Sequence, residues 1–381
     1  MSTLCNGAVT SMTWAPDDLA DLVGPSTTAP APPIAPGQDD LPPLISGSVL
    51  AKAINSAWSG VPVTIVTAPA GGGSSRLAAD LARWLSGPAG LSVGLVVRTE
   101  AEQFTNPAGG RVSVVTDLAL IGARATVAII DSAASRSFHD VDTGLPPGIA
   151  QVVLVGDPAQ TGDPAPGMIP GPAQPDAIAG FMRAVAPEHL RVIRSTVSHR
   201  VGPEMAEALA SAYPGGIIPC TPPVVTFADG SPRPPISALI LDPGTEPDDM
   251  RVLGALAGAA RAEVGGSIRA SDVLVIVPRY SQAVRVRALL DDLADIAVIT
   301  QDEAWGRQAP VVLALDPVAG AEPADSHLAR RGRLVTLLTR HSHRLIWVTD
   351  PTTGTQIRQE DGDVETLPIR EALLAAAHLI R

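Results

Sequence analysis

Three kinds of residue are scarce in this 381-residue chain: cysteine, lysine and the aromatics. Cys5 and Cys220 are the only cysteines, which excludes a disulfide framework, and no CxxC or His/Cys spacing indicates a zinc site. Aromatic residues make up 3% of the chain, which argues against single-strand binding by many stacked bases. Apolar runs of eighteen or more residues and a basic-then-apolar leader are also missing. We therefore expect no membrane-spanning segment and a cytoplasmic protein.

Positive charge is also scarce. The chain has 27 Lys and Arg against 39 Asp and Glu, a formal net charge of −12, which argues against a generally basic nucleic-acid surface. Lys52 is the only lysine, so arginine carries almost all of the positive charge. A site that usually holds lysine would therefore be expected to hold arginine for compositional reasons alone.

The sequence is rich in aliphatic residues, glycine and proline. Hydrophobic residues make up 45%, which predicts a globular protein, and 381 residues suffice for two cores. Residues 1–44 lack periodic apolar pattern and are predicted to be a Pro-rich arm or linker. Residues 45–213 and 237–381 each carry alternating strand-like and helix-like patterns, and the Pro-rich stretch 214–236 is the predicted linker between these two domains.

Short aliphatic runs bounded by Gly, Pro or Asp mark the predicted strands. Such runs, rich in β-branched residues, are typical of parallel strands covered on both faces. They occur at Val63–Val66, Val93–Val97, Val112–Val115, Val127–Ile130 and Val152–Val155, then at Ala238–Leu241, Val273–Val277, Ile296–Ile299, Val311–Leu315 and Leu345–Val348. Leu77, Leu81 and Leu85 lie on one helical face between the first two. The sequence predicts an α/β protein of two tandem domains with parallel sheets flanked by helices.

A glycine-rich turn joins the first predicted strand to this helix. Free amides at a helix N-terminus and the helix dipole both favour an anion. The phosphate-loop pattern is G-x-x-x-x-G-K-[ST], in which Ala68 replaces the first glycine and Ser74 the lysine. The alternative is an ordinary glycine turn. The candidate phosphate-binding residues are Gly71, Gly72, Gly73, Ser74, Ser75 and Arg76.

Two further strand ends carry acidic residues. Asp131 follows Val127–Ile130, where a phosphate-loop enzyme holds its magnesium-organising acid, although Asp131 could instead cap the next turn. The turn 156–160, Gly-Asp-Pro-Ala-Gln, follows Val152–Val155. Carboxyl ends of parallel strands share one edge of a sheet, where ligands bind. We therefore expect these turns and the glycine turn to form one site.

These motifs and those that follow them resemble the conserved motifs of superfamily 1 helicases, in particular viral ones, and occur in the same order. Segment 154–160, Leu-Val-Gly-Asp-Pro-Ala-Gln, looks like motif III of that family. Further resemblances follow in the family's order: Ser198-His199-Arg200 with Glu204 and Tyr213-Pro214-Gly215-Gly216, then Val277–Gln282, then Thr300–Gly306 as motif V, and Val335–His341 as motif VI. The resemblance covers residues 45 to about 350.

The resemblance implies two RecA-like phosphate-loop domains with ATP and Mg²⁺ between them. It implies that Ser75 ligates the metal, that Asp131 holds its water shell and that Gln160 senses the γ-phosphate. It also implies that Arg200 and Arg340 approach that phosphate from the two sides of the cleft. Single-stranded nucleic acid, with RNA favoured, and replication-complex proteins or a second copy are the implied partners.

Three departures from the family pattern weaken the predicted chemistry. Ser74 replaces lysine, Ser132 stands where the water-activating glutamate belongs, and Trp305 takes the place of a glutamine. A general base contributes about 10²–10⁴ in rate and a phosphate-stabilising cation about 10³–10⁵. We therefore predict a helicase-like protein with impaired or absent ATP hydrolysis.

Such a protein would act in viral or mobile-element replication, in the host cytoplasm if viral. One alternative is a non-enzymatic helicase-like RNA-binding movement or scaffold protein. A second is an active ATPase or helicase with relocated catalytic residues. The run from Arg340 to Arg344 is predicted to be a solvated basic edge that RNA phosphates could meet.

Overall fold

The computed structural model describes residues 45–87, 89–98, 111–121, 124–160, 175–227, 229–242, 248–317, 319, 331–350 and 366–380. The predicted arm 1–44 and Cys5 lie outside these residues. Within the described ranges, no helix is long and apolar enough to cross a membrane.

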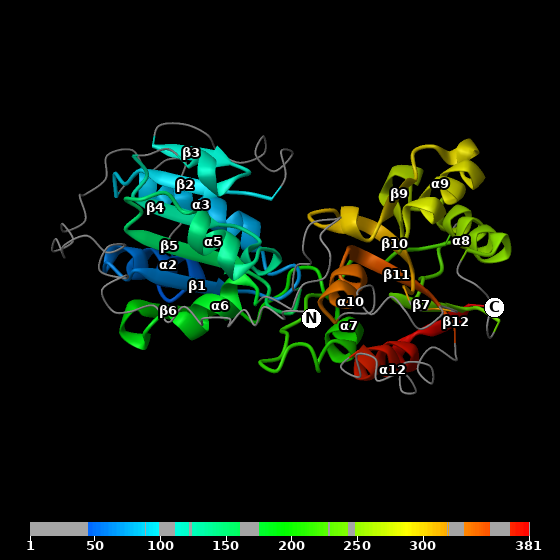
Figure 1. The fold of residues 1–381 in the computed structure, drawn as a ribbon. Helices are drawn as coiled ribbons and strands as arrows, with labels where there is room; N and C mark the ends of the chain where they lie inside the picture. Colours follow the sequence, from blue (N-terminus) through cyan, green and yellow to red (C-terminus); the bar gives the residue numbers. More distant parts are fainter. Residues whose placement is uncertain are drawn as a thin grey trace, which may run out of the picture.

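Two six-stranded sheets, in which every pairing is parallel, form the framework (Figure 1). In spatial order, the first sheet consists of β3 (Val112–Val115), β2 (Val93–Val96), β4 (Val127–Ile130), β5 (Gln151–Gly156), β1 (Val63–Thr67) and β6 (Leu190–Arg194). The second consists of β12 (His378–Ile380), β7 (Ile236–Ile240), β11 (His341–Thr349), β10 (Ala309–Leu315), β8 (Val273–Val277) and β9 (Ala297–Thr300). The prediction of two tandem α/β domains with parallel sheets is confirmed.

Helices cover both faces of each sheet, as expected from the unbroken aliphatic strands. The longer helices are α2 (Val49–Trp58), α3 (Ser74–Ser86), α5 (Phe138–Gly144), α6 (Ala177–Ala184), α7 (Pro203–Ala208), α8 (Met250–Glu263), α9 (Tyr280–Leu289), α10 (Arg331–Leu338) and α12 (Leu367–Ala376). Short 3₁₀ turns are η1 (Leu118–Leu120), η2 (Ala133–Ser135), η3 (Pro187–His189), η4 (Ala270–Asp272), η5 (Asp291–Leu293) and η6 (Asp302–Ala304).

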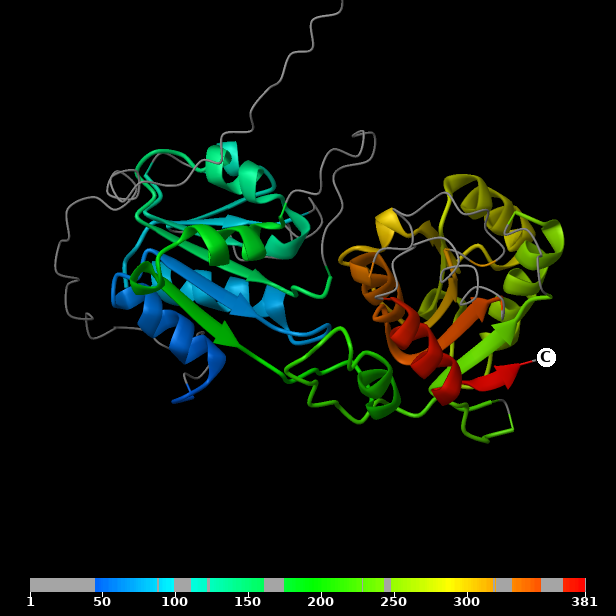
Figure 2. The ribbon, with the colours of Figure 1, turned by 60° about the horizontal axis from the view of Figure 1, so that its bottom comes forward.

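The first domain has one apolar core on each face of its sheet. Helices α2 and α3 cover one face, and α5 and α6 cover the other (Figure 2). Leu81 and Leu85 of α3 are fully buried against Val66, Leu95 and Val153 of the strands. Leu77 of the same predicted face is only partly buried. The apolar stripe therefore fixes α3, and with it the glycine turn that precedes it, on the sheet.

The order of strands in the first sheet decides which loops are neighbours. β5 pairs with β1 on one side, through Thr67 and Gly156, and with β4 on the other, through Ile130 and Leu154. The turn after β5 therefore lies between the glycine turn after β1 and Asp131 after β4. All three lie at the carboxyl edge of the sheet, as the sequence predicts.

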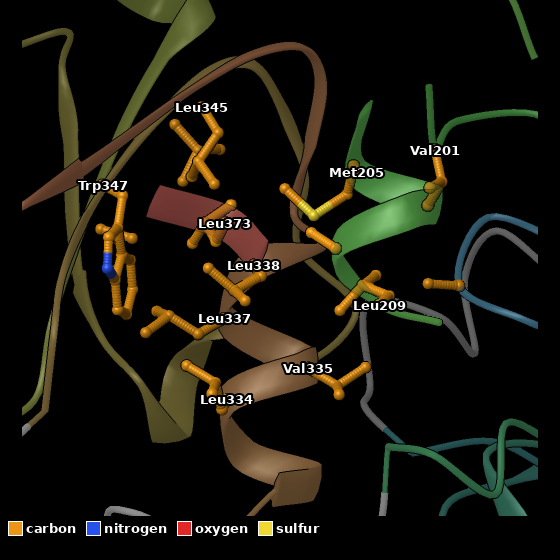
Figure 3. Packing of buried hydrophobic residues seen from close by; sticks show 14 of the residues in the cluster. Val201, Met205, Leu209, Leu334, Val335, Leu337, Leu338, Leu345, Trp347 and Leu373 are labelled. Atoms are coloured by element: carbon orange, nitrogen blue, oxygen red, sulfur yellow. The ribbon is translucent and has the colours of Figure 1, made fainter. Parts of the chain in front are cut away.

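Helix α7 follows the first sheet in sequence but packs with the second domain. Met205 and Leu209 belong to the same buried cluster as Leu338 of α10 and Leu373 of α12 (Figure 3). Val201, just before α7, is part of this cluster as well. The segment that precedes the predicted linker is thus anchored in the second core.

Candidate functional site

Two glycines of the turn between β1 and α3 have a left-handed backbone conformation. Gly71 and Gly73 adopt φ of +72° and +77°, a region that residues with a Cβ rarely occupy, and Gly73 caps α3. The first amides of a helix have no partner within the helix, so those at the start of α3 are available to a ligand. Ser74 is half-buried and Ser75 is exposed.

The segment before α7 holds this loop in place. The Ser198 hydroxyl donates to the Ala70 carbonyl at 2.7 Å, and the His199 amide donates to the Gly71 carbonyl at 2.9 Å. The Ala70 amide donates to the Tyr213 hydroxyl at 3.3 Å. The loop is therefore bonded to a segment that packs with the second domain.

We predict that Gly71→Ala destabilises the protein more than Gly73→Ala. A Cβ on Gly71 would lie 2.5 Å from the Cβ of Arg200, whereas a Cβ on Gly73 would meet nothing within 4 Å. Both variants pay about 1–2 kcal/mol for the left-handed backbone, and Gly71→Ala adds an overpacking cost of about 1–3 kcal/mol. Urea unfolding of the two variants measures the difference, and equal free energies of unfolding would contradict this contact.

Asp131 is buried at the carboxyl edge of the first sheet. It is 1% exposed, and its Oδ1 accepts the amide of Ser132 at 2.7 Å. Ser132 has φ of +54° and is the only non-glycine residue with positive φ in the described part of the chain. A strained residue beside a buried carboxylate is typical of a functional turn.

The turn after β5 reaches across to the second domain. Gln160 donates from Nε2 to Asp157 Oδ2 at 2.9 Å, and its Oε1 accepts Arg340 Nη2 at 2.6 Å. Arg340 also donates from Nε to the Thr336 carbonyl at 2.8 Å. Gln160, Asp157 and Arg340 are all at least nine-tenths buried. The structure thus joins two predicted site residues that are 180 positions apart in sequence.

Asp157 is the carboxylate at the centre of this network. Burial raises its pKa from 3.8 to about 6, against the opposing effects of hydrogen bonds from Tyr213 and Ala159 and the nearby charge of Arg340. Tyr213 donates its hydroxyl to Asp157 Oδ2 at 2.6 Å, and burial and this carboxylate raise the tyrosine pKa well above 10.

Positive charges gather around Arg340. Desolvation and the charges of Arg200 and Arg98 together lower the pKa of Arg340 to about 9, against the opposing effects of Asp157 and Tyr213. Desolvation also lowers the pKa of Arg200, whose Nε is buried without a hydrogen-bond partner among the described residues. Arg200 Nη1 donates to Gln308 of the second domain at 3.0 Å. Three guanidinium groups that repel one another make a site suited to a polyanion.

Arg98 and Trp305 form a second contact between the domains. The Arg98 guanidinium lies 4.2 Å from the centre of the Trp305 ring, a cation–π contact. Arg98 follows β2, which neighbours the strand of Asp131, and Trp305 follows η6 of the second domain. Trp305, which replaces a glutamine in the family pattern, thus packs half-buried against an arginine.

Side-chain exposure corrects one sequence-based expectation. The run from Arg340 to Arg344 is not a solvated basic edge, because Arg340, His341 and Arg344 are each at most 5% exposed. They are buried because this run continues from α10 into β11, a central strand. The Arg76 side chain is 85% exposed and pairs along the helix with Asp80 at 3.7 Å.

The predicted site residues therefore fall into two groups. Gln160, Arg200 and Arg340 lie in one charged network, and the backbone of Gly71 contacts Arg200. Asp131 and Ser75 lie at the same sheet edge. Sequence reasoning gave no role to Arg98 or to the Tyr213 hydroxyl. The only sequence signal for Tyr213 is that it lies in the motif-like segment that follows Arg200. Its hydrogen bond with Ala70 could not be predicted, because the two residues are 143 positions apart.

Comparison with known proteins gives fold-level likeness only. No protein-family model matches this chain, and no curated protein matches it. Among solved structures, it is similar to an arterivirus nonstructural protein 10 helicase, with 20% identity and a TM-score of 0.42 over 82% of this chain and 59% of that one. A complex of arterivirus nonstructural protein 10 with DNA is 18% identical, with a TM-score of 0.46 over 88% of this chain and 67% of that one.

A third similar structure is the PRRSV helicase, at 15% identity and a TM-score of 0.41, over 80% of this chain and 54% of that one. All three are helicases, the class that the motif order resembles. The chain spans between 54% and 67% of the length of these proteins. Because these likenesses are distant, the function rests on the geometry of the site.

Proposed function

We propose that this chain binds a nucleoside triphosphate between its two domains, in the manner of a superfamily 1 helicase, and that it hydrolyses the nucleotide poorly or not at all. The contact of Gln160 with Arg340 is the observation that carries the proposal. It joins a strand-end turn of the first domain to an arginine of the second, beside a glycine loop with free helix amides. An anion held there would contact both domains.

The residues fit a triphosphate with magnesium, although the fit is incomplete. Mg²⁺ in proteins is usually held by one or two side chains together with substrate phosphates and water, which Ser75 and Asp131 would provide. The metal would neutralise phosphate charge. Loop amides, Arg200 and Arg340 would bind the phosphate oxygens. Ser74 and Ser132 leave no loop cation and no glutamate base, which is the reason to propose impaired hydrolysis.

The proposed ligand of the two-domain surface is single-stranded nucleic acid, with RNA favoured, in a viral or mobile-element replication complex. The net charge of −12 predicts weak binding with few phosphate contacts. The dependence of log K on log salt counts these contacts, at about −0.7 per phosphate for a single strand. A slope near zero would favour the alternative of a protein scaffold that binds no nucleic acid.

Restoring the two missing groups tests the proposed chemistry. We expect Ser74→Lys/Ser132→Glu to gain at least about 10²-fold in ATP turnover over a wild type near background, because a base and a phosphate cation are both supplied. Glutamate adds little backbone strain at Ser132, since serine already carries a Cβ there. Calorimetry with Mg-ATP and a phosphate-release assay provide the measurements.

The matched control is Ser74→Gln/Ser132→Gln, which adds similar length without the cation or the base. Rapid turnover by the wild type would contradict the impairment and favour an ATPase with relocated catalytic residues. Absence of nucleotide binding by both the wild type and the lysine–glutamate variant would refute the nucleotide site.

A further inference from the structure

The Tyr213 hydroxyl lies between the glycine loop and the charged network of the cleft. It accepts the Ala70 amide at 3.3 Å and donates to Asp157 Oδ2 at 2.6 Å. Asp157 in turn accepts Gln160, and Gln160 accepts Arg340. A continuous chain of hydrogen bonds therefore runs from the loop backbone to the guanidinium of the second domain.

Asp157 accepts three hydrogen bonds from within the protein. Its Oδ1 accepts the Ala159 amide at 3.0 Å, and its Oδ2 accepts both Tyr213 and Gln160. It is 9% exposed. Three protein donors hold this carboxylate in place, so we assign Asp157 a positioning role rather than that of the glutamate that Ser132 replaces. Its effect on the site passes through its partners.

The Tyr213 ring is anchored in the core shared with the second domain. It belongs to the buried cluster that holds Met205 and Leu209 of the α7 region together with Leu338 and Leu373 (Figure 3). Movement of the second domain relative to the first sheet therefore acts on the Tyr213 hydroxyl through packing, as well as on Gln160 through Arg340. Tyr213 and Gln160 both donate hydrogen bonds to Asp157.

We propose that Tyr213 and Asp157 are positioning residues that couple the glycine loop to Arg340, so that occupancy of the loop and placement of the second domain depend on each other. The identity of the ligand in this inference rests on the proposed function. The coupling itself rests on the hydrogen bonds alone. Burial and its raised pKa make the Asp157 carboxylate sensitive to its partners, because any lost donor leaves buried charge unsolvated.

Tyr213→Phe is the informative variant because it removes the hydroxyl and leaves the ring in the core. We combine it with Arg340→Met in a double-mutant cycle on the full chain. The cycle is read out as the affinity for the non-hydrolysable analogue AMP-PNP with Mg²⁺. If the residues are coupled, the factor by which Arg340→Met weakens AMP-PNP binding changes by about 5- to 100-fold in the Tyr213→Phe background. Additive effects would overturn the proposal.

The same cycle on the equilibrium constant for unfolding requires no nucleotide. We expect the effect of Arg340→Met on this equilibrium constant to differ by about twofold to a hundredfold between the wild-type and Tyr213→Phe backgrounds. We also expect the peptide that contains Ala70 to exchange its amide hydrogens faster in Tyr213→Phe. The matched control is Tyr280→Phe, at the only other tyrosine, which is 68% exposed and should leave that exchange unchanged.

These readouts separate the two claims. If the wild type does not bind AMP-PNP and the unfolding cycle is non-additive, the nucleotide site fails and the coupling stands. If AMP-PNP binds and both cycles are additive, the coupling fails and the nucleotide site stands. A purely structural Tyr213 would lower stability without changing the effect of Arg340→Met, and that result would also overturn the proposal.

Discussion

Replacing Arg340 by methionine is expected to raise the free energy of unfolding by about 1–3 kcal/mol, because a buried cation that two neighbouring cations repel is exchanged for an apolar side chain of similar length. Desolvation and the charges of Arg200 and Arg98 lower the Arg340 pKa from 12.5 to about 9. The folded protein thus holds this guanidinium protonated at pH 7 at a cost of about 5 kcal/mol. The hydrogen bonds lost to Gln160 and Thr336 offset part of the gain.

The gain in stability should be accompanied by a loss of anion binding. Inorganic tripolyphosphate should raise the melting temperature of the wild type, because it relieves the repulsion among the three arginines, and should raise that of Arg340→Met much less. Thermal and urea unfolding with and without tripolyphosphate provide the measurement. A variant that is less stable than the wild type by more than about 1 kcal/mol would show that the hydrogen bonds outweigh the desolvation of the charge.

His341 is expected to make the protein sensitive to acid. Desolvation, followed by the charge of Arg200, lowers its pKa from 6.5 to about 3, against a hydrogen bond to the Leu338 carbonyl. Between these two values the unfolded chain binds a proton that the folded protein does not bind. The stability contributed by neutral His341 is therefore present above about pH 6.5 and decreases as the pH falls, by about 2 kcal/mol between pH 6.5 and 4.5.

The measurement is urea unfolding at several pH values for the wild type and His341→Gln. The variant should lose much less stability on acidification, since glutamine does not titrate. Asp157 acts in the opposite sense, because its pKa is raised from 3.8 to about 6, so its contribution increases as the pH falls through that range. The contribution of Asp157 is the same in the wild type and in His341→Gln, so it cancels when the free energy of unfolding of one protein is subtracted from that of the other.

His343 provides the matched control. Its side chain is only half-buried, and the charge of Asp272 opposes the desolvation that lowers its pKa. His343→Gln should therefore keep most of the wild-type acid sensitivity. Parallel pH profiles for the wild type and His341→Gln would mean that His341 is protonated equally in the folded and unfolded states, contrary to its burial.

The strands that carry the site could be predicted from sequence because they are buried on both faces. Val127–Ile130 and Val273–Val277 have the predicted bounds. The edge strands β6 and β12 were not predicted, because Leu190–Arg194 alternates with exposed charged residues and His378–Ile380 has only three residues. After Val277, the apolar residues Val286, Leu289, Leu290 and Leu293 predict a helix from about Gln282 to Leu293. In the structure α9 begins at Tyr280 and ends at Leu289, and η5 covers the last predicted turn.

The site itself could be predicted only where one residue follows a recognisable strand or motif. Asp131, Gln160, Arg200 and Arg340 were named in this way; the structure places the last three in one network, and their roles stay predictions. The guanidinium of Arg98 on the Trp305 ring could not be found, because stacking between two domains leaves no periodicity in either segment. The burial of His341 was also missed, since the polar run 340–344 looks solvent-exposed until β11 is placed in the centre of its sheet.

The sequence by itself determined the α/β class, the two series of parallel strands and the glycine turn, because aliphatic runs and glycine positions are local consequences of burial and backbone geometry. Tertiary structure alone decided that α7 packs with the second domain, that Tyr213 bonds to the glycine loop and that Arg98 and Arg200 lie close enough to Arg340 to lower its pKa. These contacts join residues more than a hundred positions apart, and only the packing of two cores brings such residues within hydrogen-bond distance.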